Sequence, residues 1–352
     1  MKLDAEALRH LSNEHFRVLT AIEMGQRNHE IVPLPLIDQI AGLRRGGTHK
    51  LLRDLGRHKL VHHDGTKYDG YRLTYQGYDF LAIKTLVRRG VLTAVGRLLG
   101  VGKESDIFEA LGADGEVVVL KLHRLGRTSF RSVRKNRDYL RRGSHFSWLY
   151  LSRLAAIKEA AFMRALGDRG FPVPDAIDQN RHAVVMSHVE GYPLVQVREV
   201  RHPAQVFNEL MAILCRMAAV GLVHCDYNEF NVLVSREDDA ITVIDFPQMV
   251  SVTHRNAKEL FDRDVECIIR FFRRKVGWDP ESDPDVKVLR PDLADYAATE
   301  HSVDRELHAS GFKTKHQEAL EAYEWRRGSD DEGGSGDDES GDEGEGESEG
   351  EE

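Results

Sequence analysis

The chain has 352 residues, of which 41% are hydrophobic, and this is enough for two domains with buried cores. No stretch reaches the roughly 18 uninterrupted apolar residues of a membrane span, and the start MKLDAEALRH lacks the apolar run of a signal peptide. The three cysteines are scattered and favour neither a disulfide framework nor a zinc site. These features predict a cytosolic or nuclear protein that makes no contact with membrane.

The net charge of −9 is determined by the end of the chain. Residues 329–352 contain 13 of the 58 acidic residues and no lysine or arginine, so the rest of the chain has a small excess of basic residues. A basic body with an acidic extension indicates a polyanionic partner. Residues 328–352 consist mainly of Gly, Ser, Asp and Glu, cannot bury an apolar core, and are predicted to form a disordered acidic tail.

The first 90 residues predict a winged-helix domain. Apolar residues recur at helical spacing in 16–25, 33–43 and 48–61, with Thr48 as the expected cap of the third helix. Two short strands around a turn near residues 65–69 and a helix over 76–90 complete the order. The third helix and the wing carry basic side chains that suit nucleic-acid phosphates, although the face of a protein-docking winged helix would look the same. These side chains are Lys50, Arg53, Arg57, His58, Lys59 and Lys67.

From residue 91 onward the pattern predicts a bilobal α+β domain. Short strands are expected in 95–111, 115–125 and 181–189, with a long helix at 149–166. Helices at 207–222 and 260–275 flank a hairpin formed by 231–234 and 240–246. The predicted division is an N-lobe over about 91–186, a C-lobe over about 187–285, and an extension over 286–327 with one helix at 314–327.

A glycine-rich turn, GVGKES at residues 100–105, lies between the first two strands of this domain. Glycines let the backbone approach a phosphate, and the side chains of Lys103 and Ser105 can bind phosphate oxygens. A glycine-rich hairpin turn without a ligand is the alternative interpretation of this segment.

Lys121 lies on the strand VVVLKLH, and Glu159 interrupts the apolar face of the long helix. A carboxylate on the face by which a helix docks needs a cation, and Lys121 can supply it. The pair would then orient the α and β phosphates of a nucleotide, as the strand lysine and helix glutamate do in protein kinases. A solvated position for Glu159 is the alternative.

The segment HCDYNEFN places Asp226 five residues before Asn231, which is the spacing of a kinase catalytic loop. Asp226 would accept the proton of the attacking hydroxyl group or water, and Asn231 would bind Mg²⁺ through its side-chain oxygen. Asp245 ends the second strand of the hairpin, so strand pairing should bring it beside Asn231 at the same metal ion. His224 is expected to pack and to form hydrogen bonds without acting as a base.

The chain departs from ordinary protein kinases in two places. Pro247 stands where the glycine of the Asp-Phe-Gly motif is expected, and no Ala-Pro-Glu motif follows, so no room remains for a peptide-binding segment. Small-molecule phosphotransferases of the aminoglycoside and choline kinase type also use an HxDxxxxN loop and an Asp that no glycine follows, and they are an alternative. So is a nucleotide-binding scaffold that needs no catalysis.

Residues 124–142 form a basic insertion between Lys121 and Glu159. Basic side chains interleaved with aromatic ones indicate RNA contact, and a basic lid over ATP is the alternative. The basic residues are Arg124, Arg127, Arg131, Arg134, Lys135, Arg137, Arg141 and Arg142, and the aromatic residues in and just after the insertion are Phe130, Tyr139, Phe146 and Trp148.

Taken together, these segments resemble the Rio atypical protein kinases, specifically the eukaryotic branch of the winged-helix-containing subfamily. The motifs that carry the resemblance are GVGKESDIF, LKLHRLGRTSFR, RDYL, SWLYLSRLAAIKE, HCDYNEFN, IDFPQMV and FDRDV, and the likeness covers about residues 1–325. The fold that it implies is a winged helix followed by a trimmed, kinase-like RIO domain and an acidic tail. Cys225 departs from the pattern, because relatives usually have glycine there.

The resemblance implies an ATP- and Mg²⁺-dependent serine/threonine kinase or ATPase that acts in cytoplasmic maturation of the small ribosomal subunit. It would bind precursor particles and their rRNA, would be cytoplasmic with passage through the nucleus, and could form a phosphoaspartate at Asp245. The oligomeric state stays open. The catalytic residues implied are Asp226, Lys121 and Asp245, with Asn231 and Asp245 as metal ligands. The nucleotide-binding residues implied are Val101, Gly102, Lys103, Glu104, Ser105, Lys121, Glu159, Met186, Ser187 and Val189, the last three through backbone groups that face adenine.

Overall fold

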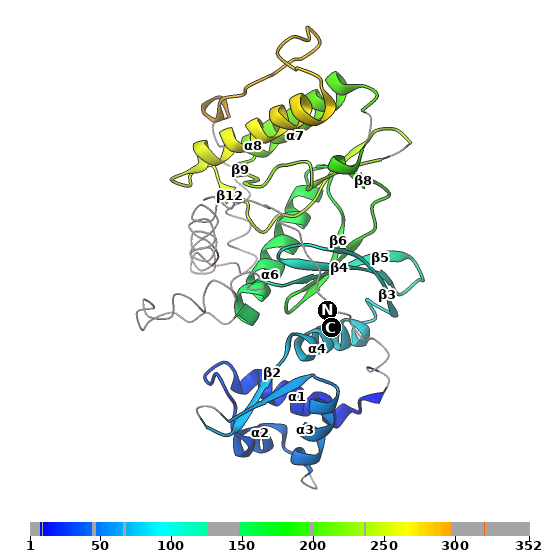
Figure 1. Cartoon of the computed structure of the whole chain (residues 1–352), viewed down its shortest axis with the longest axis vertical. Helices are drawn as coiled ribbons and strands as arrows, with labels where there is room; N and C mark the ends of the chain where they lie inside the picture. The colour runs from blue at the N-terminus through cyan, green and yellow to red at the C-terminus, as the bar shows by residue number, and fades with distance from the viewer. Residues whose placement is uncertain are drawn as a thin grey trace, which may run out of the picture.

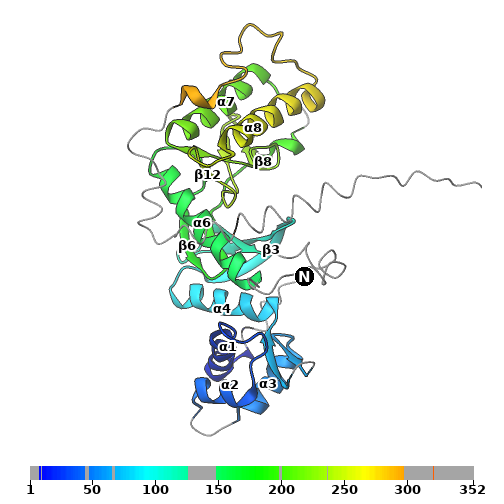
Figure 2. The same ribbon diagram turned by 90° about the vertical axis from the view of Figure 1, so that its left-hand side faces the viewer.

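The computed structural model describes residues 8, 10–43, 47–65, 68–125, 148–197, 200–235, 237–296 and 320. Figure 1 shows three parts along the long axis of the molecule: a small helical domain, a β-sheet with one long helix, and a helical lobe. The turned view in Figure 2 shows the same order. The predicted fold class, a winged helix before a trimmed bilobal kinase-like domain, is confirmed.

The N-terminal domain has the predicted order of three helices, a hairpin and a fourth helix. Its elements are α1 (Asn13–Gly25), α2 (Leu34–Ala41), α3 (Thr48–Arg57), β1 (Val61–Asp64), β2 (Gly70–Leu73) and α4 (Tyr75–Arg88). The two strands pair antiparallel from Val61 with Leu73 to Asp64 with Gly70. A shared apolar core, including Leu19, Ile22 and Leu55, fixes the helices against the hairpin.

The expected capping role of Thr48 was wrong. Gly47, in a left-handed conformation, precedes the helix, and Thr48 is the first helical residue and is buried. Its hydroxyl group donates a hydrogen bond to the side chain of Asp38 on α2. Thr48 therefore joins two helices of the domain, a tertiary contact that the local pattern does not reveal.

The N-lobe is a five-stranded antiparallel sheet in the order β3-β4-β5-β7-β6. Its strands are β3 (Ala94–Val101), β4 (Ser105–Leu111), β5 (Val117–His123), β6 (Ala176–Asn180) and β7 (Ala183–Ser187), and α6 (Trp148–Gly167) packs on β5, β6 and β7. The sequence pattern missed β6, whose residues AIDQN, three of them polar, form the edge of the sheet beside β7.

The alternation of side chains along β5 gives the sheet two different faces. Val118, Leu120 and Leu122 share a core with Ala82 and Ile83 of α4. Lys121 therefore belongs to the opposite face, where it meets α6. As a result, α4 completes the winged helix and also covers the back of the N-lobe sheet.

The C-lobe is mainly helical, with short strand pairs near the cleft. Its elements are β8 (Tyr192–Pro193), η2 (Leu194–Gln196), α7 (Pro203–Ala219), β9 (Leu222–Val223), β10 (Val232–Val234), β11 (Ile241–Val243), β12 (Val250–Ser251), α8 (Ala257–Phe271), a π-helical turn η3 (Phe272–Val276) and η4 (Leu293–Asp295). The predicted hairpin is present, because Val232 pairs with Val243 and Val234 with Ile241.

Several predicted segments lie outside the described residues: the helix at 314–327 apart from Leu320, the acidic tail, and residues 126–147 of the basic region. Leu320 is buried in a cluster with Leu125, Leu151 and Leu154. Among the described helices, none combines the length and the apolar character needed to cross a membrane.

Candidate active site

The predicted ion pair between Lys121 and Glu159 is confirmed. Lys121 Nζ lies 2.6 Å from Glu159 Oε1 and 2.8 Å from Asp245 Oδ1, so the lysine joins β5, α6 and the C-lobe. The second oxygen of Glu159 lies 2.6 Å from His123 Nε2. Lys121 and Glu159 are both buried, whereas the Asp245 side chain is 38% exposed and so reaches solvent between the two lobes.

The charges of this cluster stabilise one another. Burial by itself would raise the pKa of Glu159, but Lys121 and His123 outweigh it and lower the pKa to about 2. Burial would lower the pKa of Lys121, but Asp245 and Glu159 raise it above its usual value. Both groups are therefore charged at neutral pH, and Lys121 remains a cation that can orient phosphate oxygens.

Asp226 and Asn231 meet within the catalytic loop as their spacing predicts. Asn231 Nδ2 donates to the carbonyl oxygen of Asp226 at 2.9 Å and to its carboxylate Oδ2 at 2.8 Å. The amide N of Ile244 donates to the carbonyl of Asn231 at 3.0 Å, which places Asp245 at the adjoining position of the hairpin. The three predicted side chains thus come from two paired segments at one end of a short sheet.

These residues fit a divalent cation. The side-chain nitrogen of Asn231 is used by Asp226, so its side-chain oxygen is the atom suited to Mg²⁺, and Asp245 offers a carboxylate at the cleft. Two oxygen ligands, completed by nucleotide phosphates and water, match the preference of Mg²⁺.

Asp264 of α8 is a structural residue of the site that sequence reasoning missed. Its two carboxylate oxygens accept the backbone N–H groups of Cys225 at 2.7 Å and Tyr227 at 3.1 Å, and Arg263 donates to the carbonyl of Cys225. Burial raises the pKa of Asp264 to about 7 although both N–H groups favour the charged form. The available signal was an acidic residue on the buried face of α8, between Phe261 and Ile268.

Cys225 occupies a backbone conformation that glycine prefers. Its φ is 68° and its side chain is buried. In the left-handed region a β-carbon crowds the following carbonyl group. This explains why glycine is expected at this position in relatives. The backbone of Cys225 is strained, and the hydrogen bonds with Asp264 and Arg263 hold it in this conformation. Next to it, His224 is buried between the rings of Tyr227 and Phe246, which confirms the packing role. The expected hydrogen bonds are not formed, because neither ring nitrogen meets a partner among the described residues.

The glycine-rich segment forms the turn between β3 and β4. The N–H of Gly102 donates to the carbonyl of Ser105 at 2.8 Å, which closes the turn, and Val101 is 59% exposed. A β-carbon on Gly102 would lie 3.3 Å from Ser105 Oγ, so glycine allows the tight closure. Lys103 and Glu104 lie at the tip of this turn.

The segment predicted to meet adenine covers the end of β7 and the residues just after it. Met186 is buried at the end of this strand, and Val189 follows outside it. The N–H of Ser187 donates to the carbonyl of Asp175 at 2.9 Å, so this group is already used within the protein. The predicted backbone contact of Ser187 with adenine would therefore have to use its carbonyl oxygen, because the N–H bond to Asp175 ties the segment to the start of β6.

Arg124, the first residue of the basic insertion, and Trp148, which follows the insertion, are both packed in the folded protein. Arg124 is 4% exposed and forms ion pairs with Asp79 and Asp106, so its assignment to an RNA-binding surface was wrong. Trp148 stacks on Tyr75 of α4 with 3.5 Å between ring centroids, so this aromatic ring is also occupied. The remaining basic residues of the insertion lie outside the described residues.

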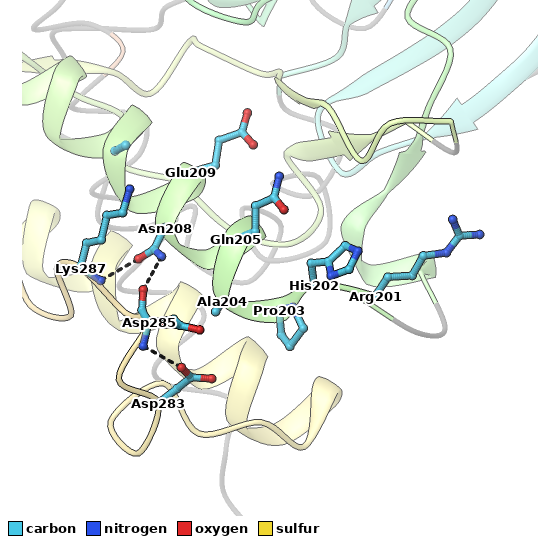
Figure 3. Close-up of a pocket in the computed structure, with 11 residues that line it drawn as sticks. Arg201, His202, Pro203, Ala204, Gln205, Asn208, Glu209, Asp283, Asp285 and Lys287 are labelled. Carbon is cyan, nitrogen blue, oxygen red and sulfur yellow. Dashed lines mark hydrogen bonds between the residues drawn. The ribbon is translucent and has the colours of Figure 1, made fainter.

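A separate cavity of about 740 Å³ lies at the start of α7. Figure 3 shows Asn208 bridging to the segment that carries Asp285 and Lys287, and Arg201 and His202 at the other end. None of the predicted site residues lines this cavity. The predicted site residues gather instead around Lys121 and Asp245.

Comparisons with known proteins agree with this geometry. The family model "RIO domain" matches residues 106–284, and the model "Rio2, N-terminal" matches residues 8–89. Serine/threonine-protein kinase rio2 of Dictyostelium discoideum is 54% identical over 89% of this chain, which spans 58% of that relative's length. The rio2 kinase of Schizosaccharomyces pombe is 47% identical over 92% of each chain.

A solved structure from Chaetomium thermophilum, described as a Rio2 kinase-ADP/Mg²⁺-phosphoaspartate complex, has a TM-score of 0.81 and 48% identity. The match covers 94% of this chain and all of that one. The fold has a buried lysine–glutamate pair and a loop with the kinase spacing of Asp226 and Asn231. Together with these relatives, it defines an ATP- and Mg²⁺-dependent enzyme of the protein-kinase class. This chain belongs to the RIO family and, within it, to the Rio2 serine/threonine-protein kinases.

Proposed function

We propose that this Rio2 chain couples ATP turnover to maturation of the small ribosomal subunit and its rRNA, acting as an assembly factor on precursor particles in the cytoplasm, with passage through the nucleus. In this role the enzyme functions as an ATPase or as an atypical serine/threonine kinase. The observation that carries the proposal is an intact phosphotransfer site in a domain that lacks space for an ordinary peptide substrate.

The shortness of the segment after Asp245 supports turnover without a peptide substrate. Only β12, paired with β9, separates Asp245 from α8, which begins twelve residues further on at Ala257. Protein kinases hold peptides with a longer activation segment and the helical region behind it. A hydroxyl group of a particle-bound protein, water, or a group of the enzyme itself is therefore the proposed acceptor.

Asp245 is the proposed acceptor within the enzyme. Its carboxylate reaches the cleft beside Lys121, and the Chaetomium relative is described as a phosphoaspartate complex. Incubation with γ-labelled ATP should produce protein-bound phosphate that hydroxylamine releases and that Asp245→Ala lacks. Label that resists hydroxylamine, or that persists in Asp245→Ala, would contradict this part of the proposal.

The winged helix supports an RNA partner. The outer face of α3 and the residues after it expose Lys50, Arg53, Arg57 and Lys59, while Leu52 and Leu55 face the core. Such a row suits the phosphates of a nucleic acid. Crosslinking of the tagged chain to RNA in cells should recover small-subunit rRNA, and reversal of Lys50 and Arg53 to glutamate should reduce the recovery.

The catalytic part of the proposal is tested with Asp226→Ala. Loss of the general base should lower ATP hydrolysis by about 10²- to 10⁴-fold, while ATP binding is retained because Lys121 and the phosphate-binding turn are unchanged. Cells that carry only this variant should accumulate unprocessed precursor particles. Normal subunit maturation in both Asp226→Ala and Lys121→Ala cells would instead identify a nucleotide-binding scaffold that needs no catalysis.

A further inference from the structure

A buried charge cluster joins the winged helix to the N-lobe behind the ATP site. The guanidinium of Arg124 donates to both carboxylate oxygens of Asp79 on α4, at 2.6 and 2.8 Å, and to Asp106 Oδ2 on β4 at 3.0 Å. His182 Nε2 lies 2.7 Å from Asp79 Oδ1. All four residues are at most 4% exposed.

The alternation of the strands places this cluster on the α4 face of the sheet. Phe108 and Ala110 of β4 face α4, so Asp106 belongs to the same face, two residues before Phe108. Arg124 follows Leu122 on β5 by the same step of two. The cluster and Lys121 therefore lie on opposite faces of one sheet, and the guanidinium group of Arg124 forms its ion pairs with Asp79 and Asp106, neither of which is predicted to bind ATP.

The cluster nevertheless fixes both residues that flank Ser105. Through its backbone N–H, Arg124 donates to the carbonyl of Glu104 at 2.5 Å, and through its side chain it holds Asp106. Ser105 lies between these two contacts and accepts the hydrogen bond from Gly102 that closes the turn. The end of the turn is thereby clamped to Arg124 on both sides.

On its other side, Arg124 is held by the winged helix through Asp79 of α4. Asp79 lies in the middle of α4 and holds Arg124 with a bidentate pair, the geometry that restricts a guanidinium most strongly. Burial would raise the pKa of Asp79, but Arg124 and His182 outweigh it and keep this carboxylate ionised. A shift of α4 would therefore be transmitted to Arg124 and, through it, to Glu104 and Asp106.

We propose that Arg124 is a positioning residue for the phosphate-binding turn and that Asp79 of the winged helix holds it in place, so that the position of the winged helix sets the affinity of the site for nucleotide phosphates. This inference rests on the binding of ATP phosphates at residues 101–105. A partner that moves α4 would change ATP affinity from the back of the sheet.

The test compares nucleotide and nucleoside binding in Asp79→Asn, which removes the charge at the winged-helix end and touches no residue of the turn. The Kd of ADP with Mg²⁺ should rise about tenfold, which corresponds to about 1.4 kcal/mol, whereas the Kd of adenosine should change less than twofold. Binding of ADP to the wild-type protein is measured first. A wild-type protein that does not bind ADP would contradict the proposed ATP site, which separates this failure from a failure of the role of Arg124 and Asp79.

Glu23→Gln is the matched control. Glu23 of α1 forms a bidentate pair with Arg181, at 2.7 Å for both bonds, which also ties the winged helix to the N-lobe. The other side-chain hydrogen bonds of Arg181 go to α4 and Asn180 and not to the turn. This variant should leave the ratio of the two affinities unchanged. Equal loss of ADP and adenosine affinity in Asp79→Asn, no loss of either, or the same ADP-specific loss in Glu23→Gln would overturn the proposal.

Circular dichroism establishes whether Asp79→Asn is folded. If it is not, Asp79→Glu keeps the charge but displaces it, and Arg124→Lys keeps the cation but cannot span Asp79 and Asp106 together. Each should show the same ADP-specific loss. Unchanged ADP affinity in a folded Arg124→Lys protein would also refute a clamp that needs the guanidinium.

Discussion

Replacement of Glu159 by glutamine tests whether the Lys121 cluster is held by charge. The substitution keeps the size of the side chain and removes its charge, in a position where Lys121 Nζ and His123 Nε2 both lie 2.6 Å from the carboxylate. We expect the variant to fold with lower stability and to hydrolyse ATP more slowly, because Lys121 would be held by Asp245 alone.

The magnitude follows from the ionisation of the group. A pKa lowered from 4.5 to about 2 means that the folded protein favours the charged form by about 3 kcal/mol. Loss of one partner from a buried pair typically costs about 3 to 5 kcal/mol. Since Asp245 still pairs with Lys121, we expect about 3 kcal/mol at pH 7, measured as the free energy of unfolding in urea.

The dependence on pH has a defined sign. Because the pKa of Glu159 is lower in the folded state, its contribution is fully present above pH 4.5 and is lost as the pH falls toward 2. The stability difference between wild type and Glu159→Gln should therefore be constant from pH 7 to pH 5.

Glu109→Gln is the matched control, because it breaks the exposed pair with Arg97, whose side chain is 76% exposed. Exposed pairs typically contribute about 0 to 1 kcal/mol, so this variant should be close to wild type. A cost below 1 kcal/mol for Glu159→Gln, or one no larger than that of Glu109→Gln, would refute the reasoning.

Three further predictions concern the catalytic loop. Burial lowers the pKa of His224 from 6.5 to about 4, so the unfolded state takes up a proton first as the pH falls, and the free energy of unfolding should decrease by about 3 kcal/mol between pH 6.5 and 4. In His224→Gln the free energy of unfolding in urea should depend less on pH over this range. An unchanged dependence on pH would contradict the prediction. At a φ of 68° glycine is favoured over alanine, so the Cys225→Gly variant should be about 1 kcal/mol more stable than Cys225→Ala and should have the higher Tm. A higher Tm for Cys225→Ala, the order usual at other positions, would show that the backbone is not strained here. Asp264→Asn offers one acceptor to two buried N–H groups and should cost about 1 to 3 kcal/mol and lower kcat; unaffected kcat would argue against a role in holding the loop.

The order of elements and the chemistry of the cleft could be predicted from the sequence because both follow local rules. Strand alternation turns Lys121 away from the apolar residues beside it, and a carboxylate on an apolar helix face must find a cation, which together predicted the pair with Glu159. The hairpin that brings Asp245 to Asn231 was visible as two apolar runs around turn residues. The spacing of Asp226 and Asn231 lies within one loop, so no tertiary information was needed to recognise it.

Contacts between distant segments were decided only by the tertiary structure. Nothing local indicates that Arg124 leaves a basic run to pair with Asp79, 45 residues earlier in the chain, or that Asp264 reaches back 39 residues to the N–H of Cys225. The edge strand β6 was missed for a similar reason, since its polar residues are held by backbone pairing with β7 and carry no apolar alternation.

The amino-acid sequence alone was enough to predict the fold class and the family, and it also predicts the groups that bind ATP, because periodicity and motif spacing are local properties of the chain. The tertiary structure decided which charges are buried and with what partner, because burial depends on the element that covers each face of the sheet. Here that element is α4, and its position behind the sheet turns Arg124 from an expected RNA contact into a link between the winged helix and the phosphate-binding turn.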